Sequence, residues 1–547
     1  MNNRPLLIVA AGSVNPNLYG DLGKILTSHI PLSGKLAILD QVEKAAQVYS
    51  TIYILIDRRA ENLGKVLKSK FNVIPILGSA EDSLTDTFRS AFESIESDGR
   101  LDILFGDSYS TDLLENDSEN DDVIFIAVRN DYSSWLCVAR GLVSTALTFF
   151  QNSTKSVDVE IVTGSFRISN LKLFKKILND ESKVSPKDTS FWNSWIKYDE
   201  ALGNTIALMI DKSWQDIGHV DTYFAARREL ITKSSRSFNR ITMDKGSLRI
   251  TKTGPETKIR LEKKWFDDVP PEIKVYTPLT FESNIPNSYE IEYETSIPVN
   301  EMWISGNRDD SYWHLFAENL QLLLGVMHSL NQTTTPSLKQ VTFKKQMYST
   351  KVSHRVESFL KETEFDHFFK KEIRLNGQPL PKLGKVLEEI EKVSMKISQI
   401  DNWSIIHGDL CFSNMIYDRR KNQIKLLDPR GSFIEEGIYG DPVYDLIKLS
   451  HSILGNYDFF ACNLFSLTQY ETHFEMSTAL PHGVSIAKDI CEGVITNQLP
   501  LRGLSYHDLR MLEAGLFLSA AELHLENDRG LALFLNGLEI AKGVLSE

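Results

Sequence analysis

The chain has 547 residues, more than one typical domain holds, so we expect two or three large units. Its composition, 42% hydrophobic and 24% charged, is that of ordinary globular proteins and excludes a chain that is disordered throughout. The net charge of −13 argues against a nucleic-acid-binding surface, which normally carries a basic stripe.

Cysteine spacing and hydropathy indicate the compartment. The 4 cysteines show no C-x-x-C spacing, which predicts neither a zinc site nor a disulfide framework and favours a reducing compartment. No apolar run approaches the roughly 20 residues of a membrane span. We therefore expect a cytoplasmic protein that acts on small molecules, without nucleic acid or membrane insertion, and the sequence leaves its oligomeric state open.

Residues 1–230 alternate strand-like apolar runs with helical patterns. The strand-like runs cover residues 6–13, 51–57, 72–77 and 102–107, and the helical patterns cover residues 38–48 and 82–97. This alternation predicts a doubly wound α/β domain that binds its ligand at the carboxyl ends of the strands. The first run ends in the small-residue turn Gly12-Ser13, whose backbone N–H groups are suited to hold a phosphate.

Several segments of this region resemble sugar-phosphate nucleotidyltransferases. Residues 10–13 are similar to the start of their glycine-rich loop, residues 31–35 to a later G-K-P segment, and residues 164–166 to the lining of their sugar pocket. The resemblance implies that Gly12, Ser13 and Lys35 bind a nucleoside triphosphate.

Two aspartates lie in segments that resemble the metal-binding segments of the same enzymes. Asp107 ends the sequence Phe-Gly-Asp, similar to their L-G-D, and Asp216 lies in the second segment. The resemblance implies that both hold Mg²⁺, because a reaction that joins two phosphates needs a divalent ion held by two carboxylates.

The glycine-rich loop also departs from that family. No arginine lies between Ser13 and Asp57, and Leu36 stands where the proline of G-K-P is expected. The missing arginine leaves less positive charge to stabilise a leaving pyrophosphate. A working transferase, a domain that only binds a nucleotide sugar, and an unrelated α/β domain therefore all stay open.

A polar stretch at residues 232–237 interrupts the helical pattern and predicts a boundary between domains at 1–230 and 231–547. Strand-like runs follow at residues 239–243, 248–252 and 290–294, with a helical pattern at residues 258–266. Further helices are expected at residues 313–330, 351–360, 384–400, 508–526 and 530–544, and the chain after Asp445 is expected to be mostly helical.

The strongest signal in the chain lies between His407 and Gly431. Asp409 and Asn414 stand five residues apart, and Asp428 begins the sequence Asp-Pro-Arg-Gly. The residues between Asn414 and Asp428 have the pattern of a tight hairpin, which would bring these two side chains together at one Mg²⁺ ion. Phosphoryl transfer needs hard oxygen ligands for Mg²⁺ and one carboxylate to orient and deprotonate a hydroxyl.

This motif resembles the aminoglycoside phosphotransferase and choline kinase superfamily. The resemblance implies an α+β bilobal, protein-kinase-like domain, with an amino-terminal lobe at residues 231–300 and a carboxyl-terminal lobe at residues 301–547. It implies Asp409 as the catalytic base and Asn414 and Asp428 as ligands of Mg²⁺.

The order of elements before the motif matches the amino-terminal lobe of such kinases. In that order Ser234 and Ser235 cover the phosphates of ATP, Lys252 contacts them, and Glu262 pairs with Lys252. Three other lysines compete for the phosphate contact, namely Lys258, Lys263 and Lys264. In the carboxyl-terminal lobe, four residues either line the pocket for the acceptor or belong to the core, namely Tyr457, Asp458, Phe459 and His524.

Together these features predict a bifunctional enzyme. A kinase would phosphorylate a sugar or another small hydroxyl compound with ATP, and a nucleotidyltransferase would couple that phosphate to a second nucleoside triphosphate, giving an activated sugar for cell-surface or capsular polysaccharide. Two alternatives remain: a choline or ethanolamine kinase fused to a cytidylyltransferase, and a kinase or scaffold whose first domain only binds a nucleotide sugar.

Overall fold

The structure is a computed structural model that describes residues 4–97, 99–115, 122–129, 135–140, 147–150, 158–231, 240–244, 246–306, 309–329, 337–363, 365, 371–525 and 528–545. The chain divides into two compact units. Unit 1 holds residues 1–32 and 36–227, and unit 2 holds residues 33–35 and 228–547. None of the described helices is long and apolar enough to cross a membrane.

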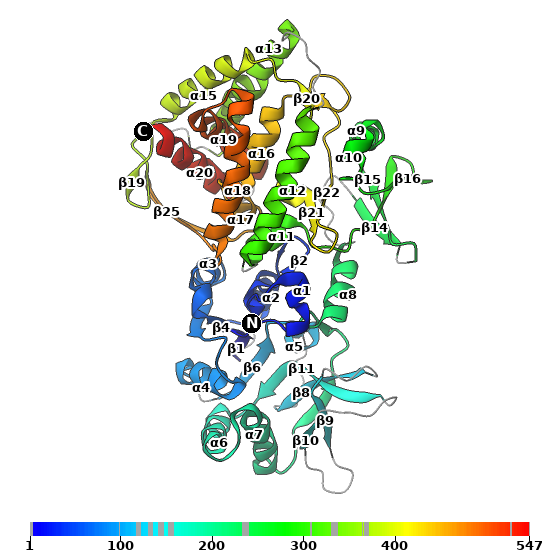
Figure 1. Ribbon diagram of the computed structural model, residues 1–547. Helices are drawn as coiled ribbons and strands as arrows, with labels where there is room; N and C mark the ends of the chain where they lie inside the picture. The colour runs from blue at the N-terminus through cyan, green and yellow to red at the C-terminus, as the bar shows by residue number, and fades with distance from the viewer. Residues whose placement is uncertain are drawn as a thin grey trace. The chain divides into compact units, whose positions relative to one another are not determined.

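Unit 1 is built on a nine-stranded mixed sheet (Figure 1). Its central strands are β1 (Leu6–Ala10), β4 (Ile52–Asp57), β5 (Ile74–Gly78) and β6 (Leu101–Phe105). β1 pairs in parallel with β4 and β6, and β4 pairs in parallel with β5. The predicted α/β class and its four parallel strands are therefore confirmed.

The other half of this sheet was not predicted. It consists of β8 (Val123–Arg129), β9 (Cys137–Arg140), β10 (Leu147–Phe150), β11 (Val159–Ile168) and β12 (Ala207–Ile210). β11 runs antiparallel to β6, β8 and β9, and β12 is parallel to β8. The sheet order is β10-β9-β11-β6-β1-β4-β5, with β8 and β12 beyond β11.

Helices α2 (Ala37–Val48), α3 (Glu61–Phe71) and α4 (Leu84–Ser94) connect the parallel strands, and α6 (Leu171–Val184) and α7 (Lys187–Ala201) follow β11. Alternate residues of the strands point to one face and meet α4, α6 and α7 in an aromatic core that includes Phe88, Phe166, Phe174, Phe191 and Trp195. The rings of Phe88 and Phe191 stack with centroids 4.3 Å apart.

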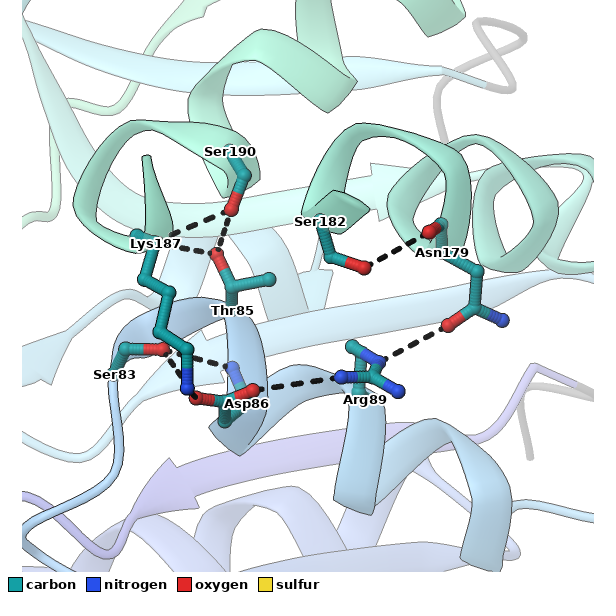
Figure 2. Close-up of polar contacts among 8 residues, drawn as sticks. All are labelled: Ser83, Thr85, Asp86, Arg89, Asn179, Ser182, Lys187 and Ser190. Atoms are coloured by element: carbon teal, nitrogen blue, oxygen red, sulfur yellow. Dashed lines mark hydrogen bonds and ion pairs between the residues drawn. The ribbon is translucent and has the colours of Figure 1, made fainter. Parts of the chain in front are cut away.

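Polar contacts also join the same three helices to one another (Figure 2). The hydroxyls of Thr85 and Ser190 are 2.6 Å apart, and Lys187 Nζ lies 2.9 Å from Asp86. Arg89 Nε donates to Asn179 Oδ1 at 3.1 Å. These bonds join α4 to both α6 and α7 and fix how the three helices lie on the sheet.

Several further elements lie outside the nine-stranded sheet. They are α1 (Tyr19–Leu22), β2 (Pro31–Leu32), β3 (Lys35–Leu36), β7 (Ser108–Tyr109), α5 (Thr111–Glu115), β13 (Gln215–Asp216) and α8 (Val220–Ile231). β7 directly follows β6 and pairs antiparallel with β13. This pairing brings two distant parts of the chain to the end of β6.

Unit 2 begins with a four-stranded antiparallel sheet in the order β14-β15-β17-β16. The strands are β14 (Arg240–Asp244), β15 (Arg249–Thr253), β16 (Thr280–Glu282) and β17 (Ser288–Glu292), and α9 (Glu256–Asp268) and α10 (Pro271–Lys274) connect β15 to β16. The predicted strands and helix are present, whereas the edge strand β16 was not predicted. Lys252 on β15 is directly opposite Tyr289 on β17.

The rest of unit 2 is mainly helical (Figure 1). Its helices are α11 (Val299–Ser305), α12 (Asp310–Ser329), α13 (Leu338–Lys345), α14 (Lys351–Glu362), α15 (Leu383–Ser398), α16 (Pro442–Ile453), α17 (Tyr457–Ala461), α18 (Val484–Gln498), α19 (Tyr506–Ala520) and α20 (Asp528–Leu545). The predicted tight hairpin is confirmed as β21 (Met415–Asp418) and β22 (Gln423–Leu426), which pair antiparallel.

One expectation for this region was wrong. The chain after Asp445 is not helical throughout, because β24 (Phe465–Tyr470) and β25 (His473–Thr478) form a second hairpin. They extend a small sheet with β18 (Arg374–Leu375) and β19 (Gln378–Pro379). A further pair joins β20 (Ser404–Ile405), just before the predicted catalytic loop, to β23 (Tyr439–Gly440).

Candidate active sites

The loop that carries Asp409 joins β20 to β21 in unit 2. Asn414 Nδ2 donates to Asp409 Oδ2 at 3.0 Å and to the Asp409 backbone oxygen at 2.9 Å. Lys448 Nζ, from α16, lies 2.8 Å from Asp409 Oδ1. Burial opposes the charge of Asp409, but Lys448, His407 and Asn414 outweigh it and lower the pKa to about 2. Asp409 is therefore an anion at every physiological pH.

Asp445, in the first turn of α16, holds this loop in place. Its Oδ2 accepts from the His407 backbone N–H at 2.7 Å and its Oδ1 from the Gly408 N–H at 2.8 Å. Gly408 has φ +80°, and a Cβ there would approach the Arg430 Cβ to 2.7 Å, so only glycine fits. Burial raises the pKa of Asp445 to about 7, against the two N–H bonds that favour its ionised form.

His407 connects the loop to the chain before Asp428. Its Nε2 lies 2.8 Å from the Leu427 carbonyl oxygen, and its Nδ1 lies 3.3 Å from the Asp409 backbone N–H. Burial lowers the pKa of His407, so the ring is neutral, with the proton on Nε2 donated to Leu427 and Nδ1 accepting. The histidine of the motif is thus a positioning residue.

The β21–β22 hairpin brings the chain at Asp428 back next to the backbone of Asn414. The Leu427 N–H, next to Asp428, donates to the Asn414 backbone oxygen at 2.9 Å. Asp428 has φ +55°, a conformation that few residues other than glycine adopt and that often marks functional sites. Because Asn414 uses Nδ2 to bond Asp409, its Oδ1 is the atom left for a cation, and this oxygen set fits Mg²⁺.

Lys252 joins the small sheet to this centre. Its Nζ lies 2.6 Å from Glu262 Oε2 and 2.7 Å from Asp428 Oδ1, and the Tyr289 hydroxyl donates to the same glutamate oxygen at 3.2 Å. Lys252 and Glu262 are 3% and 2% exposed. Burial opposes the charge of Lys252, but Asp428 and Glu262 outweigh it and raise the pKa. The structure therefore brings together Lys252, Glu262 and Asp428.

The three competing lysines on α9 lie elsewhere. Lys258 is half exposed and 3.7 Å from Glu262, and Lys263 and Lys264 pair with the exposed carboxylates of Asp267 and Asp268. Ser234 and Ser235, the predicted phosphate cover, lie outside the described residues.

A cavity of about 190 Å³ opens beside Lys448. It is lined by Met347, Tyr348, Lys351, Val352, Arg355, Tyr444, Ile447, Lys448, His451, Tyr457, Leu512, Leu516, Ser519, Ala520, Leu523 and His524. Of the four predicted pocket residues, Tyr457 and His524 line it. Asp458 and Phe459 do not: they are 1% and 0% exposed because they face the core.

Sequence reasoning missed Lys448, which contacts Asp409. A signal was available, because Asp441, Tyr444, Asp445, Lys448 and His451 recur at three- and four-residue spacing and so share one face of a helix. Asp441 lies on that face too, where its Oδ2 accepts from the Tyr348 hydroxyl at 3.0 Å.

In unit 1, Asp107 and Asp216 lie together at the end of β6. Asp216 is paired with Ser108 in the β7–β13 ladder, and the Ile217 N–H donates to the Asp107 backbone oxygen at 2.9 Å. Burial and the charge of Asp216 raise the pKa of Asp107 to about 6. A Cβ on Gly218 would lie 2.7 Å from Asp107 Oδ2, so this glycine leaves room for the carboxylate.

The negative charges of Asp107 and Asp216 repel each other, and a divalent cation bound between them would neutralise both. The pair therefore fits Mg²⁺. Asp216 Oδ2 also accepts from the backbone N–H of His219 at 3.1 Å and from the Thr222 hydroxyl, and it lies 3.1 Å from His219 Nδ1. These partners orient Asp216 through Oδ2, so its other oxygen, Oδ1, is the candidate ligand.

The predicted phosphate-binding turn follows β1. The Gly12 carbonyl accepts from both the backbone N–H and the hydroxyl of Thr27 at 2.8 Å, and Ser13 bridges to Leu26. This turn is therefore fixed from one side while Gly12 is exposed. Lys35 is on β3, and residues 33–35 are grouped with unit 2 rather than with the unit that holds Gly12 and Ser13.

The predicted lining of a sugar pocket at residues 164–166 is wrong. Gly164 (φ +82°) lies at a bulge of β11 against Phe105, and Ser165 and Phe166 are fully buried. Phe166 packs on Trp195 in the core. Its role is structural.

No protein-family model matches this chain, and no curated protein matches it. Solved structures match its amino-terminal part, about 42% of the chain. CTP:phosphocholine cytidylyltransferase from Streptococcus pneumoniae matches with a TM-score of 0.34 and 16% identity, over 42% of this chain and 100% of that one. HddC from Yersinia pseudotuberculosis matches with a TM-score of 0.32 and 18% identity, over 42% and 99%. The inositol-1-phosphate CTP transferase from T. maritima matches with a TM-score of 0.32 and 14% identity, over 40% and 91%.

Proposed function

We propose that unit 2 is a bilobal, protein-kinase-like enzyme that transfers the γ-phosphoryl group of ATP to a hydroxyl of a sugar or similar small molecule. The observation that carries the proposal is Lys252, which bonds both Glu262 and Asp428 while Asn414 bonds Asp409. These residues come from separate elements, so their convergence is a property of the fold. A lysine, three carboxylates and an amide in this arrangement are the parts that phosphoryl transfer requires.

In the proposed reaction an acceptor hydroxyl oxygen bonds to the γ-phosphorus, the bond from that phosphorus to the bridging oxygen of ADP breaks, and the hydroxyl proton passes to Asp409. A carboxylate with a pKa of about 2 is a weak base, so its main contribution is orientation, with proton transfer late in the reaction. Lys252 holds the phosphates, and Glu262 and Tyr289 fix Lys252. Asn414 and Asp428 would hold Mg²⁺, which would neutralise charge on the phosphates.

Replacing Asp409 by Asn tests this proposal. We expect kinase turnover to fall by about 10²–10⁴, the usual contribution of a positioned base. The measurement is ADP release with Mg²⁺-ATP and a panel of sugars and amino alcohols. Asp418→Asn, at the far end of β21, is the matched control that should keep full activity. Unchanged turnover in the Asp409 variant would remove this residue from the mechanism.

We infer that unit 1 is a nucleotidyltransferase that uses the phosphorylated product. In this reaction a phosphate oxygen of the product bonds to the α-phosphorus of a second nucleoside triphosphate, and pyrophosphate leaves. Asp107 and Asp216 would hold Mg²⁺ there, and the turn at Gly12 and Ser13 would receive the triphosphate. The support is the convergence of the two carboxylates at the end of β6, where α/β folds bind ligands.

The absence of an arginine between Ser13 and Asp57 favours a second possibility, in which unit 1 binds a nucleotide sugar and catalyses no reaction. Pyrophosphate release from a purified sugar phosphate with each nucleoside triphosphate separates the two. A working transferase releases pyrophosphate, and Asp107→Ala abolishes the release. If no triphosphate supports release while nucleotide sugars bind, unit 1 is a binding domain. We propose that the enzyme is cytoplasmic. Its activated product would be used in the synthesis of cell-surface polysaccharide.

A further inference from the structure

The cavity beside Lys448 carries an excess of positive charge. Lys351 and Arg355 reach it from α14 and Lys448 from α16, and none of the described residues that line it is an aspartate or glutamate. Two of these positive charges have a carboxylate partner: Lys448 pairs with Asp409 at 2.8 Å, and Arg355 Nε lies 3.4 Å from Glu522.

Lys351 is the exception. No carboxylate among the described residues pairs with it, and Arg355, Arg430 and Lys448 are its charged neighbours. Burial and then these three cations lower the pKa of Lys351 to about 8, so the side chain is mainly charged at neutral pH. A partly buried cation beside other cations is costly unless an anion joins it.

A second group in the cavity also lacks a partner. His451 is 2% exposed, and neither ring nitrogen has a hydrogen-bond partner among the described residues. Its ring contacts those of Tyr457 and Phe517, with centroids 4.0 and 4.2 Å away. Burial and Lys448 lower its pKa, so the neutral ring offers one donor and one acceptor. Buried polar atoms normally have partners, and a bound hydroxyl compound would supply them.

The size of the cavity limits the ligand. Sites for drug-sized ligands are usually roughly 300–1,000 Å³, whereas this cavity has about 190 Å³. It therefore suits a compound of about monosaccharide size. Its position next to the Lys448–Asp409 pair is where an acceptor hydroxyl has to lie for the proposed transfer.

We propose that the acceptor, within the kinase function proposed above, is a small polyhydroxylated acid whose carboxylate or phosphate is bound by Lys351 and Arg355, while His451 contacts a hydroxyl. This inference rests on the proposed kinase function. It disfavours choline and ethanolamine. Tyr348, Tyr444 and Tyr457 line the cavity, and aromatic rings can bind a cation, but the unpaired Lys351 repels one.

Direct binding tests this inference without turnover. Calorimetry on the full chain, without ATP, would compare a panel of hexuronates and hexose phosphates with the neutral hexoses and with choline. We expect at least one acid to bind about tenfold or more tightly than its neutral hexose, and Lys351→Met to remove that preference. Lys351→Arg should restore it, and Lys361→Met, an exposed lysine on the same helix, should leave it unchanged.

The outcomes separate the two proposals. Tighter binding of uronates or of hexose phosphates identifies the acid group as carboxylate or phosphate. Preferred binding of a neutral hexose or choline, equal binding of all probes, or no binding overturns the inference. The kinase function is judged separately: phosphorylation of any compound that Asp409→Asn abolishes sustains it even when the acceptor is not an acid.

Discussion

Replacing Asp445 by Asn tests how the loop that carries Asp409, the proposed catalytic residue, is held. The carboxylate accepts two backbone N–H groups, at 2.7 and 2.8 Å, and is fully buried. In the variant one oxygen becomes an NH₂ group that faces a buried N–H, so one charge-assisted bond is lost, which costs about 1.5–3 kcal/mol. If the displaced loop raises the activation free energy by about 3 kcal/mol, kcat falls about 10²-fold, since each 1.36 kcal/mol lowers the rate about tenfold.

Initial rates of the kinase reaction and thermal unfolding together measure this effect. We expect a lower kcat with the KM for ATP nearly unchanged, because Lys252 and Asp428 still hold the nucleotide side. Asp508→Asn is the matched control: Asp508 also lies in the first turn of a helix, accepts a backbone N–H and is 3% exposed, but it bonds Ser505 and Lys396 away from the loop. A kcat within about twofold of the wild type for the folded Asp445 variant, or an equal loss in the control, would refute the reasoning.

Three further results are expected. Glu262→Gln should lower kinase kcat/KM by about 10–10²-fold through a raised KM for ATP, because Lys252 loses a charged partner; a lower kcat with unchanged KM would contradict this role. Above a pH of about 8, kcat/KM for an acidic acceptor should fall in the wild type, because Lys351 loses its charge as the pH rises through its lowered pKa of about 8; the Lys351→Met variant should show no such decline, and an identical decline in both would exclude Lys351. Asp216→Asn should raise the Mg²⁺ concentration needed for pyrophosphate release about tenfold or more while the Mg²⁺ dependence of ADP release stays the same; a parallel change in both would argue against separate metal sites.

The sequence was most informative where the chemistry is local. Asp409, Asn414 and Asp428 lie within twenty residues of one another, and a two-stranded hairpin leaves few ways to arrange them. Lys252 and Glu262 were found by their order along the chain. The contact of Lys252 with Asp428 depends on packing between the small sheet and the hairpin, which no local pattern encodes.

What the sequence did not reveal depends on long-range packing. Lys448 and Asp445 contact the loop from α16, and the charge of Lys351 acts on Lys448 from a helix almost a hundred residues earlier. In unit 1 the sequence did not predict the antiparallel strands β8 to β11, and it wrongly predicted that residues 164–166 line a sugar pocket. Phe166 instead belongs to the alternating apolar face of β11, which a reading by strand period would have placed in the core.

The central claim is that two separate sites act in series, and isotope tracking tests it most directly. Wild-type protein, Asp409→Asn and Asp107→Ala would each receive an accepted hydroxyl compound, [γ-³²P]ATP, Mg²⁺ and a second nucleoside triphosphate, and labelled products would be separated over time. We predict that label passes through a phosphorylated acceptor into a nucleotide-linked product in the wild type, that the Asp107 variant accumulates the phosphorylated acceptor, and that the Asp409 variant labels neither. Loss of both steps in the folded Asp107 variant, or labelled acceptor in the Asp409 variant, would contradict the account.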